Sequence, residues 1–226
     1  MAIEDDLNEA EQVERLFTWW KENWAWLLSG IAIGLLILIG WFWWTGKKEA
    51  GAEQAGLLYR QLVAASDRND FGRMEGLKEQ IDKDYGSTPY ADQGRLLVAR
   101  MYVETGEYDK ATALLRQVAD GAKDVELRAV AQVRLARVLI QVDKPDEALA
   151  LLKPDAAGGF TALQQDVRGD AYYAKGDMEA ARVAYAAALA AAPALSPDER
   201  QVVELKLQDL AAEAGAAAPA QEQAAK

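Results

Sequence analysis

The 226-residue chain contains no cysteine and no histidine. Their absence excludes disulfides, metal or haem sites built from Cys or His, and acid–base catalysis by histidine. Basic side chains are also in the minority, 25 against 36 acidic ones, which gives a net charge of −11. Because proteins bind nucleic-acid backbones through clustered Lys and Arg, this balance argues against nucleic-acid binding. With Cys and His absent, only carboxylate or amine chemistry remains for catalysis.

One stretch of the chain lacks charge altogether. Residues 23–46 are 24 consecutive uncharged residues, rich in Leu, Ile, Gly and Trp. The helical steps from Trp24 to Trp44 extend about 30 Å, which matches the hydrocarbon core of a bilayer. All seven tryptophans lie near its two ends, where indole rings favour the headgroup boundary: Trp19, Trp20, Trp24 and Trp26, then Trp41, Trp43 and Trp44. The pattern predicts a transmembrane helix over residues 23–46.

Two other interpretations of this stretch are less favoured. A buried core helix seldom runs so far without charge, and a cleaved signal peptide would start earlier and offer small residues for cleavage before Lys47. Orientation is not decided by charge. Arg15 and Lys21 on one flank balance Lys47 and Lys48 on the other, so the positive-inside rule gives a tie.

Beyond residue 48 the sequence becomes charged, Ala-rich and Leu-rich with helical spacing, which predicts an all-α domain. Three units align on small and aromatic positions, and their leading small residues are Ala99, Ala136 and Gly169. The spacing is close to the period of about 34 residues of the tetratricopeptide repeat, so we expect a tetratricopeptide-like α-solenoid. Ala111, Ala148 and Ala181 are the expected crossing positions of the paired helices.

The turns and ends of this domain carry their own signals. Gly106 and Gly176 are expected at positive φ, with Asp109 and Asp177 as helix caps. Residues 49–85 predict an opening helical pair, and the capping box that starts at Ser196 predicts a closing helix. The expected organisation is an acidic arm at 1–22, the transmembrane helix at 23–46, a repeat domain at 47–210 and a disordered Ala/Pro/Gln-rich tail at 211–226.

No catalytic, cofactor-binding or metal-binding residue stands out. The four serines occupy membrane, helix-boundary or capping positions, and carboxylate pairs such as Asp82 and Asp84 are typical of solvated faces. No glycine-rich motif suited to phosphate occurs. We therefore predict a protein that is not an enzyme and needs no cofactor.

A short repeat stack instead offers a concave groove lined by the first helix of each unit. Arg100 and Arg137, one repeat apart, either present two guanidinium groups to a ligand carboxylate or pair with Glu104, Asp166 or Asp170; internal pairing is favoured. The groove suits a partner helix or an extended apolar peptide. Its predicted lining is Leu96, Arg100, Val103, Glu104, Val133, Arg137, Ile140, Leu163, Asp166, Asp170 and Tyr173.

Three segments carry a resemblance to a known family: "LLSGIAIGLLILIGWFWW", "VRLARVLIQVDKPDEALALL" and "VRGDAYYAKGDMEAARVAYAAAL". Over roughly residues 9–210 the chain resembles the YfgM-like ancillary subunits of the SecYEG translocon of Gram-negative bacteria. The resemblance implies a single-pass inner-membrane protein with a cytoplasmic amino terminus and a periplasmic repeat domain. It also implies partnership with SecYEG, with the membrane-anchored chaperone PpiD, and with nascent periplasmic or outer-membrane proteins.

The expected function is that of a noncatalytic accessory factor that holds a chaperone or a client beside the translocon. The alternative is a membrane-anchored repeat scaffold for an envelope assembly complex unrelated to secretion. A third class, an enzyme using carboxylates, would need a pocket with two buried acids and a raised pKa.

Overall fold

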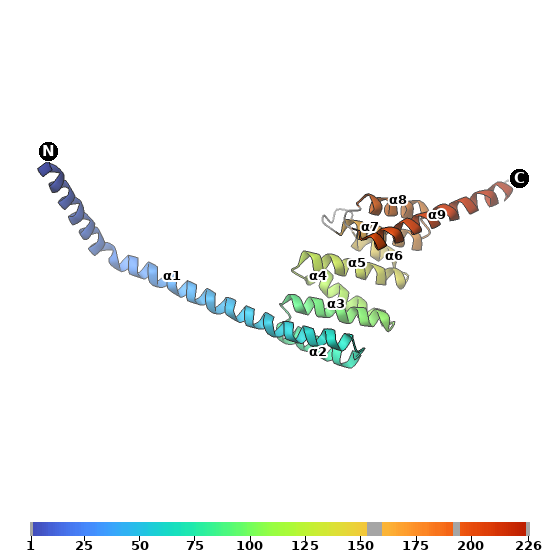
Figure 1. The fold of residues 1–226 in the computed structure, drawn as a ribbon, viewed down its shortest axis with the longest axis horizontal. Coiled ribbons are helices and arrows are strands. Elements are labelled where there is room, and N and C mark those ends of the chain that lie inside the picture. Colours follow the sequence, from blue (N-terminus) through green and yellow to red (C-terminus); the bar gives the residue numbers. More distant parts are fainter. Residues whose placement is uncertain (1, 153–159, 192–194, 225–226) are drawn as a thin grey trace. The chain divides into compact units, whose positions relative to one another are not determined.

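The computed structural model describes residues 2–152, 160–191 and 195–224, and within these ranges every regular element is a helix. Side chains are described for residues 13–42, 51–152, 160–191 and 195–212. The predicted all-α fold class is confirmed (Figure 1). The helices are α1 (Ala2–Ser66), α2 (Phe71–Tyr85), α3 (Pro89–Glu104), α4 (Tyr108–Gly121), α5 (Val125–Gln141), α6 (Pro145–Leu151), α7 (Thr161–Ala174), α8 (Met178–Ala190) and α9 (Pro197–Ala224).

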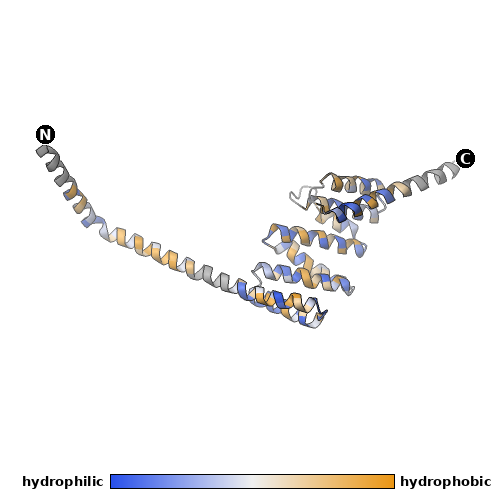
Figure 2. Cartoon of the chain, in the orientation of Figure 1, coloured by the Kyte–Doolittle hydropathy of each residue, from blue (hydrophilic) through white to orange (hydrophobic). Residues whose placement is uncertain are grey.

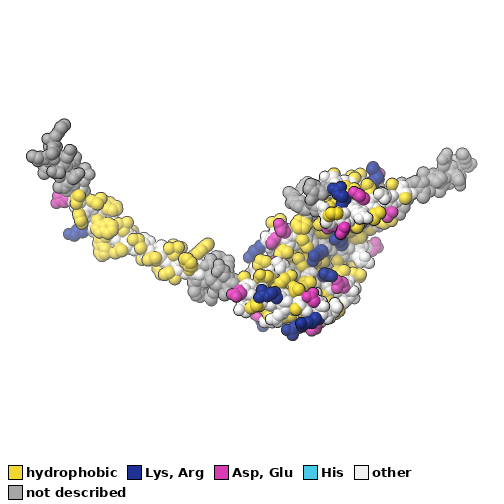
Figure 3. All heavy atoms as spheres, in the orientation of Figure 1, with side chains coloured by type: hydrophobic (Ala, Val, Ile, Leu, Met, Phe, Trp, Pro, Cys, Tyr) yellow, Lys and Arg dark blue, Asp and Glu magenta, His cyan; other side chains and the backbone are white. Residues whose placement is uncertain are grey.

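The chain divides into two compact units, Met1–Glu53 and Gln54–Lys226. Within the first unit, Val13–Phe42 of α1 is a 30-residue stretch whose most apolar 18-residue window has a mean hydropathy of 2.2, and none of that window is buried. The Leu, Ile and Trp side chains of this part of the helix are exposed. Figure 2 shows the hydrophobic run along the ribbon, and Figure 3 shows hydrophobic side chains on its surface. The stretch is long and apolar enough to cross a membrane, because 30 helical residues extend about 45 Å. The boundaries at residues 23 and 46 remain predictions, and the side chains of Trp43 and Trp44 lie outside the described residues.

The second unit contains the expected repeats as the helix pairs α3/α4, α5/α6 and α7/α8. The three predicted crossing residues, Ala111, Ala148 and Ala181, are fully buried. A larger side chain at any of them would push the paired helices apart, because protein interiors are close-packed. The end of α1 and α2 form the expected opening pair, in which Leu62, Met74 and Ile81 are almost completely buried.

The turns between paired helices use left-handed backbone. Gly106 and Gly176 have φ of +78° and +77°, as predicted. Asp143 (φ 60°) takes this place in the second unit and Asn69 (φ 54°) in the opening pair; Asn and Asp are the non-glycine residues that tolerate this region best. The repeated turn is therefore a backbone requirement that three residue types satisfy.

This requirement predicts opposite effects of alanine at two exposed glycines. Gly106→Ala forces a Cβ into the left-handed region and should lower the free energy of unfolding by about 1 kcal/mol. Gly76 lies inside α2 with open space around it, so Gly76→Ala should raise it by about 0.5–1 kcal/mol. The free energy of unfolding of both variants is measured by circular dichroism at 222 nm. Tryptophan fluorescence would not report on this unit, because all seven tryptophans lie in residues 19–44. Equal effects at the two sites would contradict the assignment.

Helix caps follow the prediction in part. Asp177 accepts a hydrogen bond from the backbone N–H of Ala180 at 3.0 Å and caps α8. The capping box is confirmed: the Glu199 backbone N–H donates to Ser196 Oγ at 3.3 Å, and Glu199 Oε2 accepts from the Ser196 N–H at 2.8 Å. The prediction for Asp109 is wrong. It lies in the first turn of α4, whose N-cap position belongs to Glu107.

Two hydrophobic clusters form the core of the second unit. The larger extends from Leu62 to Ala171 across α1 to α7. The smaller joins α7, α8 and α9 and is rich in alanine: Ala162, Ala181, Tyr185, Ala188, Leu195, Val203 and Leu210. The closing helix α9 thus packs at the end of the stack, and it is helical to Ala224, beyond the predicted domain boundary at 210.

Candidate functional site

The predicted groove divides into three groups in the structure. Leu96 and Val133 are 5% and 4% exposed and belong to the larger core cluster, so the prediction that they line a groove is corrected. The physical reason is that α3 and α5 pack between neighbouring units and are covered on more than one face. Val103 and Ile140 are partly buried and pack against the same cluster.

The two predicted arginines each have a carboxylate partner. Arg100 Nε lies 2.7 Å from Glu104 Oε1, and Arg137 Nη2 lies 3.5 Å from Asp166 Oδ2. Internal pairing, the favoured alternative, is confirmed. Each guanidinium group is therefore engaged by a carboxylate of the chain itself.

The four predicted residues of α7 lie on one face of that helix. Leu163, Asp166, Asp170 and Tyr173 are spaced by three, four and three residues, which places them in line. Asp166 is buried, Leu163 and Asp170 are partly exposed, and Tyr173 is 45% exposed. This face lies beside α9, which the sequence-based groove did not include.

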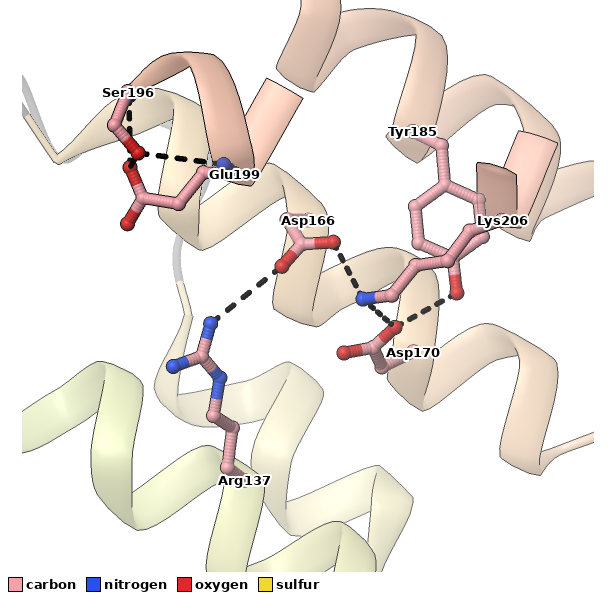
Figure 4. A network of polar contacts seen from close by, with 7 residues as sticks. All are labelled: Arg137, Asp166, Asp170, Tyr185, Ser196, Glu199 and Lys206. Atoms are coloured by element: carbon pink, nitrogen blue, oxygen red, sulfur yellow. Dashed lines mark hydrogen bonds and ion pairs between the residues drawn. The ribbon is translucent and has the colours of Figure 1, made fainter. Parts of the chain in front are cut away.

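Lys206 of α9 reaches across to both carboxylates (Figure 4). Its Nζ lies 2.7 Å from Asp166 Oδ1 and 2.6 Å from Asp170 Oδ1. Tyr185 Oη of α8 donates a hydrogen bond to the same Asp170 oxygen at 2.8 Å, while Arg137 of α5 approaches Asp166 from the other side (Figure 4). Four helices therefore meet in one polar cluster.

Burial controls the protonation of this cluster. It raises the pKa of Asp166, an effect that neighbouring Asp170 adds to and that Lys206 and Arg137 oppose. Burial and the negative charge of Asp170 raise the pKa of Tyr185, so its hydroxyl remains a donor. Asp170 is partly exposed, so the two buried acids that a carboxylate enzyme needs are not brought together here. The cluster instead fastens α9 to α7.

The raised pKa of Asp166 predicts a pH dependence with a definite sign. The folded state holds this proton more tightly than the unfolded state, so the contribution of Asp166 to stability falls as pH rises above about 4. Asp166→Asn should therefore gain stability relative to wild type as pH rises above about 4, measured by urea unfolding followed by circular dichroism. Glu199→Gln should show the opposite trend, because hydrogen bonds from Ser196 lower the pKa of Glu199. The same trend in both variants would contradict this assignment.

Two hollows lie between α7 and α9, with volumes of about 360 and 470 Å³. They share Asp170 and Lys206, and we call them together the α7–α9 groove. Its lining includes Leu163, Asp170 and Tyr173 of α7 and Asp198, Val202, Lys206, Asp209 and Ala212 of α9. The sequence-based prediction missed the α9 wall. A lysine at position 206 among Val203, Leu207 and Leu210 indicates a charge near a buried face, which needs an acidic partner.

The side chains described do not suggest a metal site. Within residues 13–42, 51–152, 160–191 and 195–212, no three acidic side chains converge in the way a bound ion would need. The groove is thus a surface of carboxylates, two cations and apolar side chains. Such a surface suits contact with another polypeptide.

Comparison with known proteins gives matches over most of the chain. The tetratricopeptide repeat-like domain family matches residues 18–212. The protein "Ancillary SecYEG translocon subunit" of Escherichia coli K12 is 32% identical over 207 residues, which cover 90% of this chain and 97% of that protein. Its namesake in Haemophilus influenzae is 26% identical over 90% of this chain and 98% of its own length. A solved structure of MamA (AMB-1) is 25% identical with a TM-score of 0.44, covering 62% of this chain and 74% of that one.

Proposed function

The chain belongs to the family of ancillary SecYEG translocon subunits, and from this membership we propose that it is a noncatalytic membrane-anchored subunit that associates with the SecYEG translocon. The observation that carries the proposal is the match over almost the whole length of relatives that bear this name. In finer detail, the repeat domain binds a PpiD-like membrane-anchored chaperone, emerging periplasmic or outer-membrane proteins, or both.

The mechanism is tethering. The apolar part of α1 confines the repeat domain to the inner membrane in which the translocon resides. Confining two weak binders to one surface raises their effective concentration, so that a modest affinity of the repeat domain suffices. No covalent step is required, in agreement with a groove whose ionised groups are mainly engaged with one another.

The proposed orientation places the amino terminus in the cytoplasm and the repeat domain in the periplasm. Protease added to the outer side of spheroplasts should then degrade the repeat domain and leave a short membrane-protected fragment. Full protection of the repeat domain in intact spheroplasts, with cleavage only after lysis, would reverse the orientation.

Association is tested by copurification. The full chain is extracted from membranes in mild detergent, and bound proteins are identified, with an unrelated single-pass inner-membrane protein as control. SecY and a PpiD-like chaperone should be enriched over the control. Enrichment of other envelope proteins without any translocon component would instead support a scaffold unrelated to secretion.

A further inference from the structure

The exposed face of α9 has an ordered pattern that its packing does not explain. Asp198, Val202, Leu205, Asp209 and Ala212 follow one another at intervals of four, three, four and three residues. This spacing places them along one face of the helix, distinct from the buried face formed by Val203 and Leu210. Val202 and Leu205 are about half exposed (49% and 50%). The face is therefore an apolar centre with a carboxylate on either side.

Four of these five residues line the α7–α9 groove opposite the face of α7, and Leu205 lies between them on the same stripe, next to the hollows. One hollow joins Leu163 to Val202, and the other joins Tyr173 to Asp209. The walls thus run in the same direction, over about 15 Å of α7 and about 20 Å of α9 at 1.5 Å per residue. Along each wall the side chains follow one another at intervals of three or four residues. The ridges of a third helix have the same spacing and could pack against them.

The charge of the groove selects the kind of helix. Its lining contains five carboxylates but only two cations, Arg137 and Lys206. The two cations already contact Asp166 and Asp170, and Glu199 belongs to the cap of α9. Among the side chains that the structure describes, none forms an ion pair with Asp198 or Asp209. The exposed face of α9 therefore carries a carboxylate without an ion-pair partner on either side of its apolar centre, Val202 and Leu205.

We propose that the α7–α9 groove is the docking site for a basic amphipathic helix of another polypeptide. Apolar side chains of that helix cover Leu163, Val202 and Leu205, and its Lys or Arg side chains contact Asp198 and Asp209. Recognition follows the helix-in-groove mode, in which apolar anchors supply affinity and flanking charges set the orientation. The inference rests on the proposed function, because it names the chemistry of the polypeptide that the repeat domain binds.

The test uses the full chain in nanodiscs of zwitterionic lipid, with empty nanodiscs as the blank. The probe is a labelled Leu/Lys peptide of about 15 residues with helical periodicity, and its Kd is measured by fluorescence anisotropy. Two further peptides separate the alternatives: one with the same composition in strict alternation, and one with Glu in place of Lys. Binding of the helical Leu/Lys peptide alone is expected. Equal binding of the alternating peptide would show an extended occupant, and equal binding of the Glu peptide would remove the charge argument.

Matched variants locate the site. Asp198→Asn/Asp209→Asn should weaken binding about fourfold, as expected for the loss of two exposed ion pairs. The control is Asp109→Asn/Asp120→Asn, which removes the same charge from two exposed residues that are also 11 positions apart on one helix, α4. Val202→Ser/Leu205→Ser should weaken binding about tenfold or more, whereas Val125→Ser/Val183→Ser, at other exposed positions, should not.

Equal effects of the groove and control pairs would overturn the inference, since the peptide would then be responding only to net charge. A change in oligomer mass in the groove variants but not in the controls would do so as well, by making a second copy of this chain the occupant. Copurification from membranes separates failure of this inference from failure of the proposed function. If SecY still copurifies while the wild-type groove fails to bind the peptide, the inference fails and the proposed function stands.

Discussion

Gly169→Ala should be among the most destabilising single substitutions in the repeat domain. A Cβ at this position of α7 would lie 2.8 Å from Cζ of the Tyr185 ring and closer still to two other ring carbons. Tyr185 is buried and its hydroxyl is bound to Asp170, so the ring cannot swing away without breaking that hydrogen bond. Overpacking of this kind should lower the free energy of unfolding by about 3 kcal/mol, even though alanine is the better helix former.

The measurement is urea unfolding followed by circular dichroism, and a double-mutant cycle identifies the cause. In a Tyr185→Ala background the clash is absent, so Gly169→Ala should cost nothing or even stabilise α7 by about 0.5–1 kcal/mol. Gly121→Ala, at the open end of α4, serves as the control for a glycine without close neighbours. Additive losses at positions 169 and 185 would show that the ring is not the obstacle.

Lys206→Met should release α9 from the end of the stack. The substitution leaves Asp166, whose side chain is 7% exposed, and Asp170 facing each other without the ammonium group between them. Removing one partner of a mostly buried ion pair is costly, and partial exposure of Lys206 reduces the loss to about 2 kcal/mol. The expected result is a lower Tm and faster proteolysis within α9, with α3 to α5 unaffected.

Neutralising the carboxylates should reverse most of this loss. In Asp166→Asn/Asp170→Asn/Lys206→Met no uncompensated buried charge remains, because Arg137, which loses its partner Asp166, is half exposed to water. Apolar contacts of Val203 and Leu210 continue to hold α9. Lys206→Arg keeps the charge and should retain most of the stability. A triple variant no more stable than Lys206→Met alone would show that lysine packing, and not its charge, fastens the helix.

Local physical requirements explain which features were predictable. The crossing alanines and the turn glycines at 106 and 176 are set by close approach and by positive φ, which a sequence displays directly. The error at Asp109 came from register. Glu107, not Asp109, is the equivalent of Asp177, because each follows its turn glycine directly.

The candidate site depended on contacts that periodicity does not encode. A helical stripe shows which residues share a face, as the spacing of Leu163, Asp166, Asp170 and Tyr173 does for α7. It does not show which faces a neighbouring unit covers, which is why Leu96 and Val133 were misplaced. Nor does it show where a closing helix returns, so the α9 wall of the groove appeared only in the folded chain.

The two hydrophobic clusters differ in how they would respond to mechanical load. The cluster that holds α8 and α9 has few large buried side chains, whereas the larger cluster contains many Leu, Ile, Met and Val side chains from elements between α1 and α7 and so buries more apolar area. In a repeat stack each unit is held by its neighbours alone. A pull on the carboxyl-terminal end of α9 would therefore peel α9 and α8 away first, at low force, and would reach α2 and α3 last.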